Sequence, residues 1–588
     1  MDSKHVTEST SGQEDIQKTW WKEAIIYQIY PRSFQDSDGD GIGDLNGITS
    51  RLDYIQSLGV DIIWLNPIFL SPNDDNGYDI SDYREIMREF GTMEDFDRLL
   101  KEIHKREMRL VLDLVVNHTS DKHPWFEEAR KSRHNPYYNY YHWWPAEKGE
   151  PPLRLSYFDE EGNAWMYNKP TDSYYLHYFS RKQPDLNWEN PEVRQEIFDM
   201  MRFWFDKGID GFRMDSISLI AKDPSFPLID SKKYPDIFSF YAKEPRLHLY
   251  LHEMNRQVLS KYDCMSVGEG SAVMVDDVAK FVDPAREELN MLYHFDAARI
   301  RNTTLPDNPE SGIDYSLIAL KKMFTEWDKA VDKGWPSIYL GNHDQPRMVS
   351  RFGSDKDEFR ALSTKMLITF LLTMRGTPYW FAGDEIGMRN IRFDRIEDYN
   401  DIDTINRYKK AKAEGKDPQA VLDEQKETGR DNARTPFQWD RSPEAGFTAG
   451  TPWLKVNPDY TWINVADEEK DPTSILNYFK KVVSFRKENP SLIYGSYHLL
   501  DAENPQSYTF LRKTGADTYL IMLNFSPKAA ISTPGIDMSN AHVLLDNYGD
   551  RSHMAPQKDI TLRPFEAIVF QLNHPVYESF IDSLDLLE

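Results

Sequence analysis

Short apolar runs alternate with amphipathic stretches along most of this chain. The runs are rich in β-branched and aromatic residues, and each precedes a stretch whose apolar positions recur at helical spacing. Eight of them cover residues 24–30, 62–67, 109–116, 211–215, 265–269, 290–295, 336–342 and 377–382. This alternation predicts parallel strands joined by helices, and eight such units close a barrel. We therefore expect an α/β fold, a (β/α)8 or TIM barrel.

Two interruptions of this pattern predict further domains. About 70 residues rich in Tyr, Trp, Pro and Gly follow the third run, too many for a connecting loop, so we expect an inserted subdomain at 119–187. Beyond about residue 493, short segments alternate in polarity and predict an antiparallel β domain at 494–588. The barrel then comprises 19–118 and 188–493, after a polar head at 1–18 that we expect to be mobile.

The charge balance excludes several classes of partner. The chain has 70 basic and 96 acidic residues, and its formal net charge of -26 repels nucleic acid and anionic lipid surfaces. No apolar stretch reaches the length of about 18 residues that a membrane helix needs. We expect a globular monomer with no nucleic acid or membrane partner. The charged residues 391–429 predict a solvated helical excursion beside the barrel mouth.

The cysteine content and the first residues bear on the compartment. Cys264 is the only cysteine, so a disulfide within the chain is excluded and we expect a packed thiol. Residues 1–15 lack the apolar core of a signal peptide, which favours a cytoplasmic protein. A periplasmic or secreted protein whose leader has been removed would show the same sequence.

Two carboxylates end two of the predicted strands. Asp215 closes the run at 211–215, and Glu269 closes the run at 265–269. Because the carboxyl ends of barrel strands face one shared mouth, both can approach the same substrate. Two carboxylates about 5 to 5.5 Å apart hydrolyse glycosidic bonds with retention, one as the nucleophile and one as the acid and base. Taken singly, each is equally compatible with a structural carboxylate held by its neighbours.

Four segments at the predicted strand ends together resemble a known family. They are Asp-Leu-Val-Val-Asn-His (113–118), Gly-Phe-Arg-Met-Asp (211–215), Val-Gly-Glu (267–269) and Asn-His-Asp (342–344). In this order they resemble the four signature regions of the α-amylase superfamily, glycoside hydrolase family 13. The resemblance extends from residue 20 to about 570. It implies a barrel with an inserted subdomain and a terminal β domain.

The resemblance also implies roles for single residues. Asp215 is the expected nucleophile, and Glu269 is the expected acid and base. Asp344 is the expected third carboxylate, which grips sugar hydroxyls and favours the distorted ring. Arg213 lies on the same strand face as Asp215 and is expected to keep it ionised by charge and hydrogen bonding.

A marker segment narrows the expected substrate. Gln-Pro-Asp-Leu-Asn at 183–187 resembles the marker of the oligo-1,6-glucosidase subfamily, which also holds maltases, sucrose isomerases and trehalose synthases. Asp75 and Arg430 match the subfamily pair that closes the pocket behind one non-reducing glucose, which implies exo-action. The other residues expected around that glucose are Tyr78, which stacks on it, Phe179 and Gln183 beside it, and His118 and His343, which donate hydrogen bonds to its hydroxyls.

Several positions depart from the subfamily pattern. Ser216 follows the expected nucleophile. Relatives with Val at this position resemble α-1,6-specific enzymes, and relatives with Thr resemble α-1,4-specific ones. Serine matches neither group, so the glycosidic linkage that the enzyme prefers stays open. Asp403 stands where many relatives have Glu. Gly270-Ser271 replaces the bulky aromatic residue of sucrose isomerases, and the segment 299–303 keeps only one arginine of their Arg-x-Asp-Arg. That arginine, Arg299, is still expected to bind substrate, but we expect it to hold fructose less firmly.

An acidic, glycine-rich loop predicts a structural cation site. Its alternate carboxylates, together with one carbonyl, suit a hard cation, and the expected ligands are Asp36, Asp38, Asp40, Asp44 and the carbonyl oxygen of Ile42. The loop opens like an EF-hand but has Gly47 in place of the closing Glu. Relatives carry Ca²⁺ in the matching loop, so we expect calcium, with magnesium as the alternative. A polar turn without metal also fits.

These features predict a retaining, exo-acting α-glucosidase that releases glucose from short α-glucosides of the isomaltose, maltose or sucrose type through a covalent glucosyl-enzyme. A sucrose isomerase that forms isomaltulose or trehalulose is the alternative. A non-catalytic binding or transporter-accessory subunit is a remote alternative, because such relatives lose the carboxylates that this chain retains. The expected partner is a small sugar, and no organic cofactor is expected.

Overall fold

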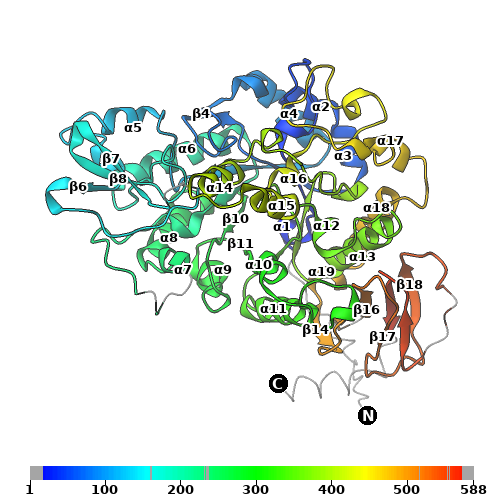
Figure 1. The fold of residues 1–588 in the computed structure, drawn as a ribbon. Coiled ribbons are helices and arrows are strands. Elements are labelled where there is room, and N and C mark those ends of the chain that lie inside the picture. The colour runs from blue at the N-terminus through cyan, green and yellow to red at the C-terminus, as the bar shows by residue number, and fades with distance from the viewer. Residues whose placement is uncertain are drawn as a thin grey trace, which may run out of the picture.

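The computed structural model describes residues 18–158, 162–230, 232–233, 237–515, 517–552, 554 and 557–572. A barrel forms its centre, a small sheet flanks it on one side, and an antiparallel sheet flanks it on the other (Figure 1). Apart from residue 18, the expected mobile head lies outside the described residues.

Eight parallel strands form the barrel, as predicted. Their order is β11-β10-β9-β5-β2-β1-β13-β12. The bounds are β1 Ile26–Ile29, β2 Ile62–Leu65, β5 Arg109–Val115, β9 Gly211–Asp215, β10 Met265–Glu269, β11 Met291–Tyr293, β12 Ser337–Ile338 and β13 Thr377–Phe381. The two end strands meet, since the hydroxyl of Ser337 on β12 donates to the carbonyl of Leu292 on β11 at 2.6 Å. Each predicted apolar run contains one of these strands.

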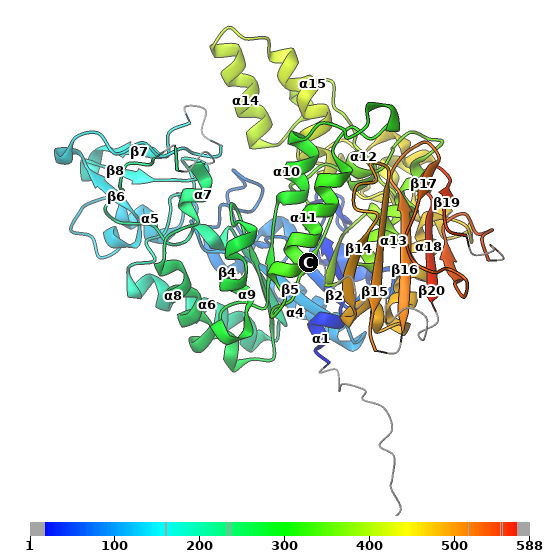
Figure 2. The same cartoon turned by 90° about the horizontal axis from the view of Figure 1, so that it is seen from below.

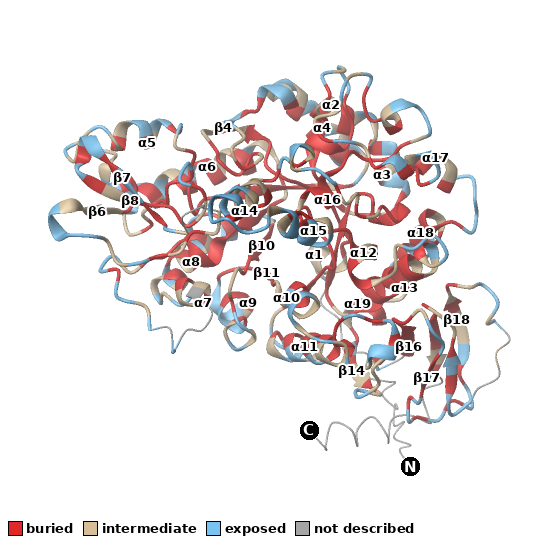
Figure 3. Cartoon of the chain, in the orientation of Figure 1, coloured by how far each residue is buried: buried red, intermediate tan, exposed pale blue. Residues whose placement is uncertain are grey.

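Amphipathic helices surround the strands and bury one face against them (Figure 3). The long ones are α4 Met93–Lys105, α6 Pro191–Lys207, α8 Arg246–Gln257, α11 Leu317–Ala330, α13 Arg360–Thr373 and α18 Ile475–Glu488. Helix α4 illustrates how the local sequence determines where such a helix begins and which face it buries. Thr92 and Asp95 form a capping box at its start, and Phe96, Leu99 and Ile103 recur on its buried face. Helix α13 is buried almost all round because it also contacts the C-terminal sheet.

Shorter helices lie in the connections. They are α1 Trp20–Glu23, α2 Leu45–Ser50, α3 Leu52–Ser57, α5 Pro124–Ala129, α7 Ile237–Tyr241, α9 Ala279–Val282, α10 Asp296–Thr303, α12 Met348–Phe352, α16 Asp431–Arg434, α17 Val465–Glu468 and α19 Ser491–Tyr494. Within the described residues, every helix is too short or too polar to span a membrane.

The predicted insertion range holds a three-stranded antiparallel sheet and helix α5. The sheet order is β6-β8-β7, with β6 Trp143–Pro145, β7 Trp165–Asn168 and β8 Ser173–Leu176. Its return to the barrel is tied by an antiparallel bridge between His118 and Asp185. This bridge brings the end of the insertion beside the carboxyl end of β5. A separate hairpin, β3 Phe69–Leu70 with β4 Asp82–Ile86, follows β2.

The C-terminal region is antiparallel, as predicted. Its five-stranded sheet has the order β14-β15-β16-β20-β18, and a two-stranded sheet pairs β17 with β19. The bounds are β14 Ser496–Leu500, β15 Ser507–Lys513, β16 Thr518–Asn524, β17 Ala530–Ser532, β18 His542–Asp546, β19 Ile560–Leu562 and β20 Ala567–Leu572.

The charged stretch at 391–429 contains a helical hairpin, α14 Ile402–Ala413 and α15 Pro418–Thr428, that projects from the barrel (Figure 2). Its inner end is packed rather than solvated, since Asp401 and Thr404 are fully buried. The expected solvated excursion therefore describes only its outer part.

Candidate active site

A cavity of about 340 Å³ opens at the carboxyl ends of the strands and collects most of the predicted site residues. The predicted residues that line it are Asp75, Tyr78, His118, Phe179, Asp215, Glu269, Arg299, Asp344 and Arg430. Gln183, Arg213 and His343 are fully buried behind this lining. A larger groove of about 960 Å³ lies at the opposite ends of β10 and β11, beside Cys264 and Asn290, away from these carboxylates.

Asp215 and Glu269 lie side by side because β9 and β10 pair in parallel register and each carboxylate ends its strand. One buried guanidinium holds both. Arg213 places Nη1 2.9 Å from Asp215 Oδ1, and its Nη2 lies 3.0 Å from Glu269 Oε2. The same Nη1 lies 2.6 Å from Oδ1 of Asp113, which is fully buried on β5. Three acidic groups thus share one cation at the cavity floor.

Opposing influences act on the protonation of Asp215. Burial and the negative charge of Glu269 raise the pKa of Asp215 well above its usual value, although Arg213 opposes them. Arg213 therefore lowers the pKa of Asp215, in the direction expected for it. Retaining hydrolysis needs one of the two carboxyl groups protonated and the other ionised.

The backbone after Asp215 also positions Glu269. Ser216 has a left-handed conformation with φ 43°, which is uncommon for a residue with a side chain. In this conformation its N–H donates to Glu269 Oε2 at 2.8 Å. Strained backbone at such a point is a frequent feature of functional sites.

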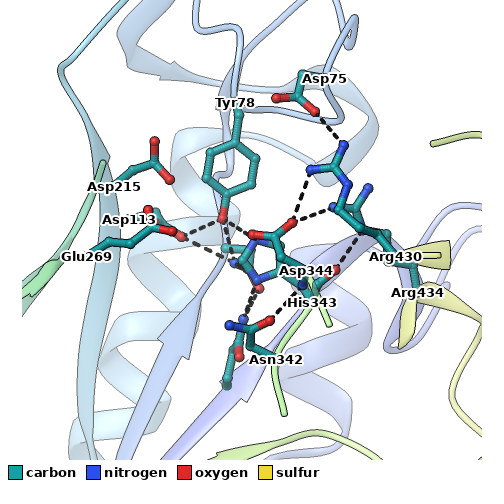
Figure 4. Close-up of polar contacts among 12 residues, drawn as sticks. Asp75, Tyr78, Asp113, Asp215, Glu269, Asn342, His343, Asp344, Arg430 and Arg434 are labelled. Atoms are coloured by element: carbon teal, nitrogen blue, oxygen red, sulfur yellow. Dashed lines mark hydrogen bonds and ion pairs between the residues drawn. The ribbon is translucent and has the colours of Figure 1, made fainter. Parts of the chain in front are cut away.

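The third carboxylate, Asp344, lies between two arginines (Figure 4). Its Oδ1 lies 3.2 Å from Arg430 Nη1 and 2.8 Å from Arg434 Nη2. Burial would raise the pKa of Asp344, but its contact with the His343 ring and the charges of Arg430 and Arg434 together hold it below its usual range. The Asp344 carboxylate is therefore ionised at neutral pH and available to accept from sugar hydroxyls.

The predicted pair of Asp75 and Arg430 is present, with Arg430 Nη2 3.3 Å from Asp75 Oδ1. Sequence reasoning did not identify the residue that holds Arg430 in place. Arg430 Nη2 lies 2.6 Å from Oδ1 of Asp401, a fully buried residue that also caps α14. It missed Arg434 as well. The sequence signal that could have found Arg434 is its spacing of four residues from Arg430, because this spacing on a short helix places both arginines on one face.

His343 lies directly behind the cavity lining. Its side chain is fully buried, and both ring nitrogens contact protein groups. Gln28 Nε2 donates to Nδ1 at 2.8 Å, so Nε2 carries the hydrogen and faces the Tyr78 hydroxyl at 2.7 Å. Burial lowers the pKa of His343 to about 3, so the ring is neutral. It supports Tyr78, whose ring stacks on it at 5.3 Å, and its Nε2 also lies 3.1 Å from Asp344 Oδ2. Donation from His343 to sugar hydroxyls stays a prediction.

His118 lines the cavity and is held by a buried polar chain. Its Nε2 donates to the Tyr78 carbonyl at 3.0 Å, and Nδ1 lies 3.2 Å from Asn117 Nδ2. Asn117 Oδ1 accepts from Lys222 Nζ at 2.6 Å, and Lys222 pairs with the buried Asp185 at 3.0 Å. Since Lys222 fixes the amide oxygen of Asn117, the amide nitrogen must face His118 and set its tautomer.

Four aromatic residues that the sequence analysis did not identify also line the cavity, beside Ser216, Ser271 and Ala272. They are Tyr157 and Phe158 from the insertion, Phe238 from α7, and Phe295 after β11. Arg299 joins them, with Nη1 3.9 Å from Asp296 Oδ1. These rings come from segments far apart in the sequence, and only their packing brings them together.

The acidic loop before α2 gathers three of the predicted cation ligands. Asp36, Asp38 and Asp40 place one carboxylate oxygen each within 4.8 Å of one another. Burial and the charges of Asp38, Asp36 and Asp44 raise the pKa of Asp40, which shows that the loop concentrates negative charge. Asp44 Oδ1 accepts from Gly47 N at 2.7 Å as the cap of α2. The roles of Asp44 and of the Ile42 carbonyl as cation ligands stay predictions. A hard cation with oxygen ligands fits the first three residues.

A barrel that presents a carboxylate pair on neighbouring strand ends, with a third carboxylate in the same cavity, defines a glycoside hydrolase. Residues 28–495 match the family described as the α-amylase catalytic domain. The chain therefore belongs to the α-amylase family, glycoside hydrolase family 13.

Relatives that match this chain over nearly its full length are known. An oligo-1,6-glucosidase from Parageobacillus thermoglucosidasius is 51% identical and covers 95% of this chain and 100% of its own length. One from Bacillus cereus is 48% identical with the same coverage of both chains. Among solved structures, the isomaltulose synthase SmuA from Protaminobacter rubrum is similar with a TM-score of 0.89 at 43% identity, covering 95% of this chain and 100% of that chain.

Proposed function

We propose that this enzyme is a retaining, exo-acting α-glucosidase that hydrolyses short α-glucosides from their non-reducing end. The observation that carries the proposal is the Arg430 ion pair with Asp75, which lies in the same cavity as the carboxylate pair. A cavity closed at this end accepts one terminal glucose and excludes the middle of a polymer. The oligo-1,6-glucosidases among the relatives support the same substrate class.

The cavity contains a side chain for each chemical role in this reaction. Ionised Asp215 attacks the anomeric carbon while the protonated Glu269 gives its proton to the leaving oxygen, so the glycosidic bond breaks and a glucosyl ester forms. Glu269, now a carboxylate, then takes a proton from water, and the hydroxide oxygen displaces Asp215 with a second inversion. Asp344 accepts hydrogen bonds from glucose hydroxyls throughout these steps.

A sucrose isomerase is the second candidate, because SmuA and the trehalulose synthase MutB from Pseudomonas mesoacidophila are similar to the chain at 43% identity. An isomerase must retain fructose until it attacks the glucosyl ester. Here Gly270 and Ser271 follow the acid and base without an aromatic ring, and Arg299 is the arginine kept from the isomerase segment. Water is then the favoured acceptor, which supports hydrolysis.

A structural cation is proposed for the loop at Asp36, Asp38 and Asp40, with Ca²⁺ as the first candidate and Mg²⁺ as the alternative. Its function would be to neutralise these carboxylates and hold the loop before α2. It would supply no step of the reaction.

The Arg430→Ala variant tests the closed pocket. It leaves Asp75 and Asp401 without their shared cation, so we expect kcat/KM for isomaltose to fall by about 100-fold or more, the scale of one broken buried charge pair. The relative rate on longer maltodextrins should rise, because the pocket end is opened. Arg407→Ala is the matched control, since Arg407 pairs with Glu424 on the exposed hairpin. An unchanged preference for disaccharides in Arg430→Ala would contradict the proposal.

A further inference from the structure

Two short segments meet behind Arg430, outside the cavity lining. One precedes α14 and contains Asn400 and Asp401, and the other begins α16 with Asp431. Oδ2 of Asp431 accepts from the backbone N–H of Asn400 at 2.7 Å and from that of Asp401 at 2.9 Å. Asp431 is fully buried and does not line the cavity, so its carboxylate does not contact substrate. Any effect of Asp431 on the reaction must pass through the residues that it holds.

Asp401 is the residue through which Asp431 reaches the cavity. Oδ1 of Asp401 accepts from Nε and Nη2 of Arg430 at 2.7 and 2.6 Å. Its Oδ2 accepts from the backbone N–H and the hydroxyl of Thr404 at 3.1 and 2.7 Å. Both oxygens are therefore occupied, and the place of the carboxylate depends on where the backbone of Asp401 lies. Since Asp431 binds that backbone, it fixes the point to which Arg430 is attached.

Arg430 passes this position on to the residues expected to bind glucose (Figure 4). Its Nη2 lies 3.3 Å from Asp75 Oδ1, and its Nη1 lies 3.2 Å from Asp344 Oδ1. A guanidinium is planar and rigid, so a shift of one partner moves the donors that face the other two. A displacement of about 1 Å in such a support can lower the rate of an enzyme by about 100-fold.

We propose that Asp431 is a positioning residue that, through the backbone of Asp401, aims Arg430 at the closed end of the glucose pocket. This role rests on the proposed α-glucosidase activity. What Asp431 supplies is an acceptor for two backbone N–H groups. Burial and the negative charge of Asp401 raise the pKa of Asp431 to about 6, although Arg434 opposes them. The charge of Asp431 therefore destabilises the folded site, and its Oδ1 accepts no hydrogen bond from the described residues.

Two substitutions separate the acceptor from the charge. Asp431→Asn keeps an oxygen for the two N–H groups, so we expect kcat/KM for isomaltose within about threefold of the parent value. Asp431→Ala leaves both N–H groups without an acceptor, and we expect a fall of about 10- to 100-fold. The rate on maltodextrins relative to isomaltose should rise in Asp431→Ala, as it should in Arg430→Ala.

Glu468→Ala is the matched control. Glu468 is also a buried carboxylate whose Oε2 accepts from two backbone N–H groups, those of Ile475 and Leu476, at 2.8 and 3.2 Å. It lies on α17, outside the cavity lining. Glu468→Ala should lower the melting temperature and keep the parent substrate preference. A similar change of preference in this control would assign the effect of Asp431→Ala to general loosening and overturn the proposed role.

A double-mutant cycle shows whether the effect runs through Arg430. Asp431→Ala, Arg430→Ala and the double variant are compared with the parent on an aryl α-glucoside, whose good leaving group keeps slow variants measurable. If Asp431 acts through Arg430, Asp431→Ala should change kcat/KM by less than about twofold once Arg430 is replaced. The same factor in both backgrounds would contradict the role. Should Asp431→Ala not fold, Asp431→Ser, whose hydroxyl is too short to reach both N–H groups, replaces it.

The outcomes distinguish this role from the function on which it rests. A parent enzyme that cleaves no α-glucoside would overturn the proposed function, and the role of Asp431 with it. An active parent with additive variants would overturn only the role. A loss in Asp431→Asn as large as that in Asp431→Ala would show that the charge, and not the backbone acceptor, matters, and would also overturn it.

Discussion

Glu269 acts on the protonation of Asp215 before any substrate binds. Burial and the negative charge of Glu269 raise the pKa of Asp215, while Arg213 lowers it and contacts both carboxylates. Asp215 must be ionised to attack, so its raised pKa places the acid limb of the pH profile of kcat/KM above the usual range of an aspartate. The position of that limb is a property of the pair.

The Glu269→Gln variant tests this coupling. Removing the charge of Glu269 should lower the pKa of Asp215, so the acid limb of kcat/KM moves to lower pH. The substrate should be an aryl α-glucoside whose leaving group needs no proton, because formation of the glucosyl-enzyme then continues without an acid. Glu326→Gln, which removes an exposed charge on α11, should leave the limb in place. A limb that stays or moves to higher pH in Glu269→Gln would contradict the coupling.

Single residues also show where sequence reasoning stops. Asp215, Glu269, Asp344, Asp75 and Arg430 could be located because each belongs to a recognisable motif, and the structure brings all five to one cavity. The sequence could not show which groups hold the His343 ring, because they are Gln28 and Tyr78, which come from other strands and loops.

At the scale of elements, the barrel strands could be predicted because buried parallel strands are short, nearly continuous apolar runs. The insertion was visible as an over-long connection rich in aromatic residues. The aromatic residues that line the cavity were not visible. Tyr157 and Phe238 lie on separate excursions whose contact depends on the packing of α7 through Tyr241, and no local pattern distinguishes such rings from core rings.

The loop before α2 gives a prediction at the element scale. If it binds Ca²⁺, a chelator should lower the melting temperature, and adding the ion back at about 100 times its Kd should restore about 2.7 kcal/mol. Asp40→Asn should shrink this calcium response. It should not destabilise the metal-free protein, because it removes repulsion among Asp36, Asp38 and Asp40.

Differential scanning fluorimetry with and without chelator measures both effects, and Asp423→Asn on the exposed hairpin is the control. Melting that is indifferent to chelator and ion in the parent protein would show that the loop is a polar turn without metal.

At the scale of the whole molecule, three parts of the chain build one cavity. The barrel supplies the carboxylates, and the insertion supplies Phe158, which lies 4.9 Å from Arg430. The helical hairpin joins them, because Asn406 Nδ2 on α14 donates to the Phe158 carbonyl at 2.6 Å. Access to the cavity is therefore set jointly by the insertion and the hairpin, which accounts for an enzyme that acts on chain ends.

The most direct test of this account is the anomeric form of the glucose released from an aryl α-glucoside, which yields a single glucose, followed by time-resolved proton NMR. Double displacement through Asp215 predicts that α-glucose appears first and converts slowly to the β anomer, with free glucose as the main product. Asp215→Asn, nearly isosteric with the parent, should release no glucose while keeping its fold by circular dichroism. Release of β-glucose first, or turnover by Asp215→Asn within tenfold of the parent, would contradict the retaining mechanism assigned to this site.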